Sequence, residues 1–259
     1  VLSKADYGKM GLIYSAIPLL NVLFTYGFET AYFRFSGDKE RNTSIYATTA
    51  ISLLLSTLVF STLLWFNTGV LAGFAGVPDY PELIKLSIII ISLDTLTTIP
   101  FARLRQQGRP VKFASLKIIG ILVNIGFTVF FLTYCPYALK QNPDSWVGWL
   151  YNSKANPVVY IVWANVLQSA VTLLFLSKEI FAIKFQFDTK LWKEMMIYSL
   201  PLIIAGMGGM FNETFDRLML RWWVPGTTIF KEEQVGVYNA CYKLSILITL
   251  FIQAFKMGA

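Results

Sequence analysis

The sequence of 259 residues is 55% apolar and only 14% charged, and its mean hydropathy is +0.56. A soluble domain usually carries charge on about a quarter of its residues, so this composition excludes a water-exposed globular body and is typical of a chain that crosses a bilayer repeatedly. The net charge of +7 does not predict nucleic-acid binding, because the basic residues lie in short stretches between apolar runs and not on one solvated face.

Seven apolar runs follow one another along the chain, and most of them reach the roughly 17 to 25 residues that a membrane-spanning helix needs. Because the backbone must satisfy its own hydrogen bonds in lipid, these runs are predicted to be helices in an all-α, polytopic bundle. In chain order the predicted spans are Gly11–Phe35, Ile45–Phe66, Leu83–Ala102, Phe113–Tyr134, Pro157–Ser177, Met195–Trp223 and Gly236–Phe255. The connection Thr189–Met196, after the amphipathic stretch Glu179–Phe187, is predicted to be the longest cytoplasmic loop and a hinge between two bundles.

Lysine and arginine are distributed unevenly over the connections between the runs. One set lies in alternate connections and after the last run: Lys39, Arg41, Arg103, Arg105, Arg109, Lys112, Lys117, Lys178, Lys184, Lys190, Lys193 and Lys256. The smaller set in the opposite connections is Lys4, Lys9, Lys140, Lys154 and Lys231. The positive-inside rule then predicts that the first set is cytoplasmic and that Val1 lies outside. A helix before Val1 would explain this orientation, so the chain is expected to be a fragment.

An aromatic belt is predicted at the outer interface: Trp65, Trp146, Trp149, Trp222 and Trp223.

Charged residues inside a span usually face the interior of the bundle or a wet cavity, because a charge in hydrocarbon is costly. The first run holds Glu29, which is expected in a cavity, and Arg34, which is expected there or snorkelling to the interface. Asp94 lies near the middle of the third run, where either a role in transport or a buried pair between helices would explain it. Asn124 in the fourth run is compatible with ordinary hydrogen bonding between helices.

The sixth run carries the most informative pattern. Four of its charged residues are spaced i, i+3, i+4 and i+8, which places them within roughly 140° of one helix face. They are Glu213, Asp216, Arg217 and Arg221. This polar stripe predicts the wall of a cavity, and an amphipathic end in the headgroup layer is the alternative. Lys243 lies a few residues into the seventh run and is expected opposite the stripe.

The sequence gives no support for enzymatic or metal chemistry. There is no histidine, and no nucleophile-elbow, phosphate-loop, zinc-protease or dinucleotide motif is present. No catalytic residue, metal ligand or cofactor is therefore predicted. Cys135 and Cys241 show no metal-binding spacing; two unpaired cysteines are the favoured interpretation, and a disulfide is the alternative.

Three segments together resemble one family. Thr25–Phe35 resembles the second helix, Asp216–Leu220 the Asp-Arg motif of helix seven, and Gly236–Leu244 the start of helix eight of polysaccharide and lipopolysaccharide biosynthesis proteins. These are oligosaccharide flippases of the multidrug/oligosaccharidyl-lipid/polysaccharide exporter superfamily. The resemblance implies a MATE-like exporter fold of about twelve to fourteen helices, in two lobes related by a parallel pseudo-two-fold axis. A shift of 228 residues pairs Gly8 with Gly236, Tyr14 with Tyr242 and Ala31 with Ala259.

On this resemblance, residues 1–188 would be helices two to six of the first lobe, and residues 189–259 would be helices seven and eight, which begin the second. Relatives bind the phosphate-sugar head group of a lipid-linked substrate in a cationic cavity between the lobes, and the planar fork of arginine suits a diphosphate. The expected anion contacts are Arg34, Arg217, Arg221 and Lys243. The carboxylates expected to orient them, or to take a coupling H+ or Na+, are Glu29, Asp94, Glu213 and Asp216.

The sequence and the resemblance together predict a transporter and not an enzyme. The expected activity is flipping of a polyprenyl-linked oligosaccharide, by alternating access, for O-antigen-like or capsule-like polysaccharide. The expected location is the inner (plasma) membrane, and the expected partners are the bilayer, the lipid-linked substrate and a polysaccharide polymerase, with no nucleic acid. A cation-coupled multidrug or small-molecule exporter is the first alternative, and a membrane glycosyltransferase or polymerase is the second.

Overall fold

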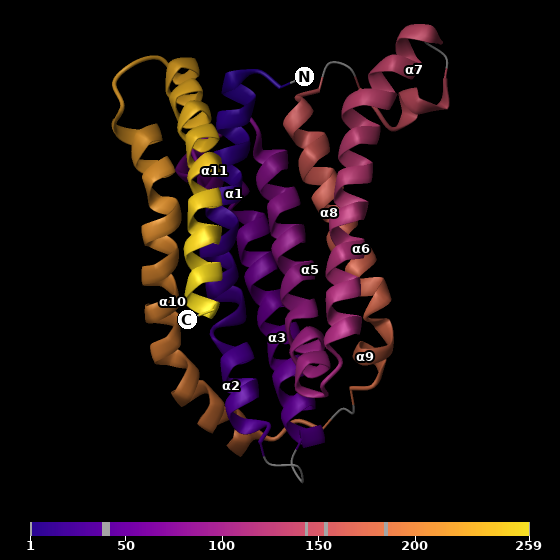
Figure 1. The fold of residues 1–259 in the computed structure, drawn as a ribbon, viewed down its shortest axis with the longest axis vertical. Helices are drawn as coiled ribbons and strands as arrows, with labels where there is room; N and C mark the ends of the chain where they lie inside the picture. The colour runs from indigo at the N-terminus through magenta and orange to yellow at the C-terminus, as the bar shows by residue number, and fades with distance from the viewer. Residues whose placement is uncertain (1, 38–41, 143–144, 153–154, 184–185, 259) are drawn as a thin grey trace.

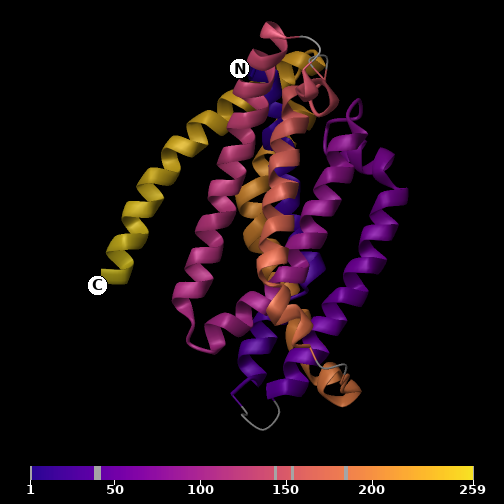
Figure 2. The same cartoon turned by 90° about the vertical axis from the view of Figure 1, so that its right-hand side faces the viewer.

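The computed structural model describes residues 2–37, 42–142, 145–152, 155–183 and 186–258, and the regular elements in these ranges are all helical. In chain order they are α1 (Lys4–Thr25), α2 (Phe28–Phe35), α3 (Asn42–Phe66), α4 (Thr68–Phe74), α5 (Pro81–Gln106), α6 (Pro110–Val129), η1 (Phe130–Tyr134), α7 (Cys135–Gln141), η2 (Trp146–Trp149), α8 (Pro157–Phe175), α9 (Ser177–Phe181), α10 (Thr189–Trp223) and α11 (Thr228–Gly258). The long helices lie side by side as one bundle (Figures 1 and 2).

Six helical stretches are long and apolar enough to cross a membrane. They are Lys4–Thr25, Thr43–Phe66, Pro81–Gln106, Pro110–Gln141, Pro157–Phe175 and Thr189–Phe211. These stretches match the first six runs of the sequence, and the seventh run lies within α11, a helix of 31 residues. The prediction of an all-α, multi-pass membrane protein is therefore confirmed.

The first predicted span is broken, so the expectation of one continuous helix over Gly11–Phe35 is wrong. Helix α1 ends at Thr25. Its C-cap residue Tyr26 has a φ of 34°, in the left-handed region, and Gly27 follows with a φ of 73°. A left-handed conformation is rare for a residue with a large side chain and persists only where its surroundings hold it. Here the Tyr26 hydroxyl is hydrogen-bonded to Ser52 on α3, at 2.7 Å. The break turns α2 away from the axis of α1.

The segment Thr189–Met196 is helical, which contradicts the prediction of a loop there. Asp188 caps this helix, because its side-chain oxygen accepts hydrogen bonds from the backbone N–H groups of Lys190 and Leu191, at 2.9 and 3.1 Å. The segment therefore forms the first turns of α10, and the described part of the connection from α9 to α10 ends at Asp188.

The two ends of the bundle differ as the charge pattern predicts. Element η2 and the end of α10, which carry Trp146, Trp149, Trp222 and Trp223 of the expected aromatic belt, lie toward the end that carries the N-terminus, beside α7 and the start of α11 (Figure 1). The end of α5, the start of α6, α9 and the start of α10 lie at the opposite end, and they carry Arg103, Arg105, Lys112, Lys178, Lys190 and Lys193. We call the first the upper end and the second the lower end, as drawn in Figure 1.

Helices α1 and α11 cross in very close contact near the upper end. A methyl group added to Gly8 would lie 1.8 Å from the backbone oxygen of Glu232, and one added to Gly236 would lie 2.4 Å from the backbone oxygen of Lys4. The contact is reciprocal, because each glycine meets the carbonyl four residues before the other. One turn further down, Gly11 meets the side chain of Asn239.

This reciprocity agrees with the parallel repeat suggested by the sequence. The contacting pairs Gly8 with Gly236 and Gly11 with Asn239 are each separated by 228 residues, the shift suggested by the sequence. The same shift relates Lys4 to Glu232, whose backbone oxygens meet Gly236 and Gly8. Both helices run downward from the upper end (Figure 1). A local two-fold axis along the bundle therefore passes between them, as it does between parallel repeats of transporters. Ala259, from the third pair of the repeat, lies outside the described residues.

Candidate functional site

Three cavities between the helices have volumes of about 600, 430 and 380 Å³. Ligand sites usually occupy about 300–1,000 Å³ and combine an apolar lining with a few placed polar groups. The chemistry of the lining therefore decides which of the three could hold a charged or sugar-bearing ligand.

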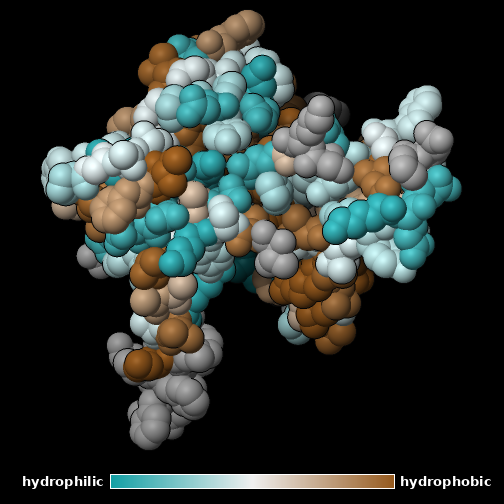
Figure 3. All heavy atoms as spheres, turned by 90° about the horizontal axis from the view of Figure 1, so that it is seen from above, coloured by the Kyte–Doolittle hydropathy of each residue, from teal (hydrophilic) through white to brown (hydrophobic). Residues whose placement is uncertain are grey.

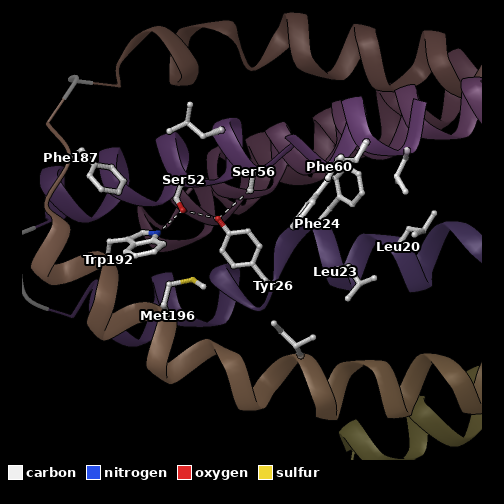
Figure 4. A pocket seen from close by; sticks show the side chains of 14 residues that line it. Leu20, Leu23, Phe24, Tyr26, Ser52, Ser56, Phe60, Phe187, Trp192 and Met196 are labelled. Atoms are coloured by element: carbon white, nitrogen blue, oxygen red, sulfur yellow. Dashed lines mark hydrogen bonds between the residues drawn. The ribbon is translucent and has the colours of Figure 1, made fainter. Parts of the chain in front are cut away.

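The first cavity, which we call the apolar groove, lies between α1, α3 and the start of α10 (Figure 4). It is lined by Leu20, Leu23, Phe24, Tyr26, Ser52, Leu55, Ser56, Phe60, Leu63, Leu64, Phe187, Trp192, Met196 and Ile203. The Trp192 indole N–H donates to Ser52 at 2.8 Å, and Ser56 donates to the Tyr26 hydroxyl at 3.3 Å. These polar groups are thus engaged with one another, and no lining residue is charged. The apolar groove has the largest volume of these three cavities, but its lining contains no cation that could bind a phosphate.

The second cavity, the upper cavity, lies below the α1–α11 crossing. It is lined by Tyr7, Met10, Gly11, Tyr14, Ser15, Asn124, Ile161, Asn165, Arg217, Asn239, Tyr242 and Lys243. These residues come from α1, α6, α8, α10 and α11, and α1 is in direct contact with α11. Hydrophilic residues gather over the centre of the molecule when it is seen from the upper end (Figure 3).

Both positive charges of the upper cavity come from α10 and α11. Arg217 donates from Nε to Oδ1 of Asn239 at 2.5 Å, and its guanidinium carbon lies 4.5 Å from the centre of the Tyr242 ring. The Lys243 ammonium lies 4.9 Å from the centre of the Tyr7 ring. These contacts fix the two cations at the cavity wall, and the described lining contains no carboxylate. Lys243, which was expected opposite the stripe of the sixth run, lines the same cavity as Arg217 of that stripe.

The opposite wall of the upper cavity is polar and uncharged. Asn124 on α6 donates from Nδ2 to Oδ1 of Asn165 on α8, at 2.7 Å. Asn165 in turn donates to the hydroxyl of Tyr14 on α1. One row of hydrogen bonds therefore joins three helices, and all three side chains line the cavity.

The third cavity, the lower cavity, holds charges of both signs. It is lined by Asn21, Glu29, Asp94, Thr97, Thr98, Phe101, Arg105, Phe113, Lys117, Gly120, Gln168 and Thr172. Glu29 forms an ion pair with Arg105, so its expected position in a cavity agrees with the structure. Asp94 accepts a hydrogen bond from Ser169 on α8 at 2.7 Å. The helix that carries Asp94 is the most enclosed of the six candidate spans, with 61% of its apolar window buried.

The two polar cavities lie one above the other along the same three helices. The paired residues, upper cavity first, are Tyr14 and Asn21 on α1, Asn124 and Gly120 on α6, and Asn165 and Gln168 on α8. Each pair is one or two helical turns apart on its helix. Polar groups therefore follow the seam between α1, α6 and α8 from the cations of the upper cavity to the charges of the lower one.

Three further predicted site residues, Arg34, Arg221 and Asp216, line neither of the two polar cavities. Arg34 is exposed at the end of α2 and lines neither one. Arg221 donates from Nε to the backbone oxygen of Gly76 at 3.2 Å, which fastens α10 to the turn after α4. Asp216 is exposed and accepts a hydrogen bond from Tyr238 at 2.8 Å. Arg217, Arg221 and Asp216 of the expected stripe therefore contact three different residues, Asn239, Gly76 and Tyr238. The side chain of Glu213 lies outside the described residues.

The sequence interpretation missed several polar residues that line the cavities. Asn165 and Gln168 are spaced i, i+3 in an otherwise apolar run, and this spacing was an available signal for a polar helix face. Tyr14 and Asn239 gave no comparable signal, because tyrosine and asparagine are common near the ends of spans.

Cys135 is buried, Cys241 is exposed, and both are free thiols, as the favoured interpretation expected. No group of three or more metal-ligating side chains occurs among the described residues.

Comparison with known proteins assigns a family but no near relative. No curated protein and no solved structure matches the chain significantly. One protein-family model, described as polysaccharide biosynthesis protein, matches residues 1–259, which is the whole chain. The multi-pass helical bundle and its buried polar cavities agree with the transporter-like membrane proteins of that family. The chain therefore belongs to the polysaccharide biosynthesis protein family.

Proposed function

We propose that this protein flips a lipid-linked oligosaccharide across the inner (plasma) membrane for the synthesis of a surface polysaccharide. The observation that carries this proposal is the upper cavity, in which Arg217 and Lys243 face an uncharged polar wall. A phosphate attached to a sugar needs both kinds of surface. Arginine and lysine suit the phosphate oxygens, because charge-assisted hydrogen bonds are roughly twice as strong as neutral ones.

The position of the cavity supports alternating access. It is enclosed by α1, α6 and α8 from residues 1–188 and by α10 and α11 from residues 189–259, which the proposal treats as parts of two lobes. The glycine contact between α1 and α11 covers the upper end of the cavity. In this proposal the upper end faces outward and the lysine-rich lower end is cytoplasmic. Opening the glycine contact would then release the head group outward.

The same proposal places the coupling H+ or Na+ in the lower cavity. Asp94 lies on the most enclosed span, and Ser169 donates a hydrogen bond to its carboxylate at 2.7 Å. Glu29 is already paired with Arg105, which makes it the less available carboxylate. An Asp94→Asn variant removes the charge and keeps the shape, so it is expected to abolish coupled transport while head-group binding persists. Binding and transport both unchanged in this variant would remove Asp94 from the proposal.

The cellular test compares three alanine variants at matched expression in a strain that depends on this protein. Arg217→Ala and Lys243→Ala are expected to reduce surface polysaccharide and to accumulate its lipid-linked precursor. Arg34→Ala is the control, because Arg34 is exposed and lines neither polar cavity. Normal polysaccharide with both Arg217→Ala and Lys243→Ala would refute the site assignment.

Export of a small hydrophobic molecule by cation coupling is the second candidate. The apolar groove favours it, because a cavity of about 600 Å³ with almost wholly apolar walls suits such a ligand. Drug resistance on overexpression, together with an unchanged glycan profile on deletion, would support this function over the first.

A further inference from the structure

In the upper cavity the two cations stand on different helices from a row of hydrogen-bonded neutral side chains. Arg217 and Lys243 stand on α10 and α11, whereas Tyr14, Asn124 and Asn165 stand on α1, α6 and α8. Arg217 and Lys243 alone would suffice to bind a ligand that carried only phosphate. Tyr14, Asn124 and Asn165, which we call the neutral wall, would complement a second chemical group on the same ligand.

The neutral wall has hydrogen-bonding capacity of both kinds left over. In the row from Asn124 through Asn165 to Tyr14, each amide uses only part of its two N–H donors and its carbonyl oxygen, and the Tyr14 hydroxyl still has its proton to donate. A phosphate accepts hydrogen bonds but does not donate them at neutral pH. A sugar hydroxyl does both, so it complements a wall that presents donors and acceptors side by side.

Asn239, on α11, holds Arg217 in place at the cavity. The side chain of Asn239 is on a residue only 6% exposed, and its Nδ2 has no hydrogen-bond partner among the described residues. Its Oδ1 is taken by Arg217. The Nδ2 atom lies against Gly11 of α1, where an added methyl group would be 1.6 Å from it, so this donor belongs to the contact between α1 and α11 and not to the ligand site.

We propose that Tyr14, Asn124 and Asn165 bind the hydroxyl groups of the sugar nearest the phosphate and so determine which glycan the protein accepts. The inference rests on the proposed function and adds that different residues bind the phosphate and the sugar. Arg217 and Lys243 hold the phosphate, which is common to all lipid-linked sugars. The neutral wall discriminates between sugars, since a site that hydrogen-bonds a hydroxyl group binds poorly those analogues that leave its polar groups unpaired.

A purely structural role for the row makes a different prediction. If the row only joins α1, α6 and α8, its loss should lower thermal stability and affect all ligands alike. The chain offers a matched control for that role in Ser61, which is hydrogen-bonded to Ser92 at 2.6 Å between α3 and α5 and lines none of the three cavities.

The test measures binding to the purified protein in detergent. The probes are undecaprenyl diphosphate without a sugar and the same lipid bearing one glucose, galactose or N-acetylglucosamine. The wild-type protein is expected to bind at least one sugar-bearing probe more tightly than the bare diphosphate. Tyr14→Phe and Asn165→Ala should each reduce that preference about 2- to 12-fold, the factor for one net hydrogen bond, and leave bare diphosphate binding unchanged. Ser61→Ala should preserve the preference.

Two results would overturn the inference and leave the proposed function standing. One is a wild-type protein that binds the bare diphosphate and treats all four probes alike. The other is a proportional loss of all four probes in Tyr14→Phe and Asn165→Ala, accompanied by a drop in melting temperature. A wild-type protein that binds none of the probes, including the bare diphosphate, would instead refute the proposed function itself.

Discussion

The contact between Gly8 and Gly236 can be tested by adding one methyl group. In Gly8→Ala the new carbon would lie 1.8 Å from the backbone oxygen of Glu232, and in Gly236→Ala it would lie 2.4 Å from that of Lys4. Ordinary contact begins at about 3.4 Å, so α1 and α11 must separate locally by about 1.6 Å or about 1.0 Å. Neither obstacle can rotate aside, because both are backbone oxygens.

The separation is expected to cost about 1–3 kcal/mol, the usual range for overpacking. It should also open the upper end of the upper cavity. We expect faster labelling of a cysteine placed at Met10, which lines this cavity, by a membrane-impermeant maleimide added to intact cells. The exposed native thiol is first removed by Cys241→Ser. Gly8→Ala should have the larger effect, because its methyl group meets the closer atom.

Gly126→Ala on α6 is the matched control, since nothing lies within 4 Å of a methyl group there. Alanine is favoured over glycine inside a helix by about 0.8–1 kcal/mol, so this control should be neutral or slightly stabilising. Labelling and melting temperature that are the same in Gly8→Ala, Gly236→Ala and Gly126→Ala would show that the two helices do not meet at these glycines. The idea of an outer closure would then fail.

Three further variants test other parts of the structure. Asp188→Ala removes the cap of α10 and should lower the free energy of unfolding by about 1 kcal/mol, measured as a lower melting temperature, with head-group binding unchanged. Arg221→Ala removes the hydrogen bond to the backbone oxygen of Gly76; it should lower the melting temperature while diphosphate affinity stays within about twofold, and a larger loss of affinity would return Arg221 to the binding site. Tyr26→Phe removes the hydroxyl that is hydrogen-bonded to Ser52 and should destabilise the protein by about 0.5–1.5 kcal/mol in a thermal melt; an unchanged melt would mean that this bond does not hold the helix break.

The membrane-spanning helices could be predicted because lipid leaves few alternatives. An apolar run of about twenty residues must satisfy its backbone internally, and a helix does so within one segment. The break at Tyr26 and Gly27 could not be predicted in the same way. It involves a hydrogen bond between Tyr26 and Ser52, a residue that lies 26 positions away on another helix. The helical start of α10 was missed because its cap, Asp188, stands before a polar stretch that read as a loop.

The charged part of the candidate site was easier to identify than the neutral part. Arg217 and Asp94 were visible from sequence because a charge within a span requires an explanation. Spacing alone did not separate Arg217 from Arg221, since both lie on one helix face and only the neighbouring helices decide which one meets the cavity. Tyr14 and Asn165 were missed because neutral polar residues often join helices in membranes without any ligand.

The central claim is that the upper cavity holds the phosphate of a lipid-linked sugar during flipping. The most direct measurement is the rate at which sealed vesicles containing the purified protein move undecaprenyl diphosphate-linked N-acetylglucosamine from one leaflet to the other. We predict that the wild-type protein and Ser61→Ala catalyse this movement. The double variant Arg217→Ala, Lys243→Ala should be slower by at least about 10-fold, as expected when charge-assisted hydrogen bonds of about 1.5–3 kcal/mol are lost. Equal rates in the double variant and the wild type would contradict the claim.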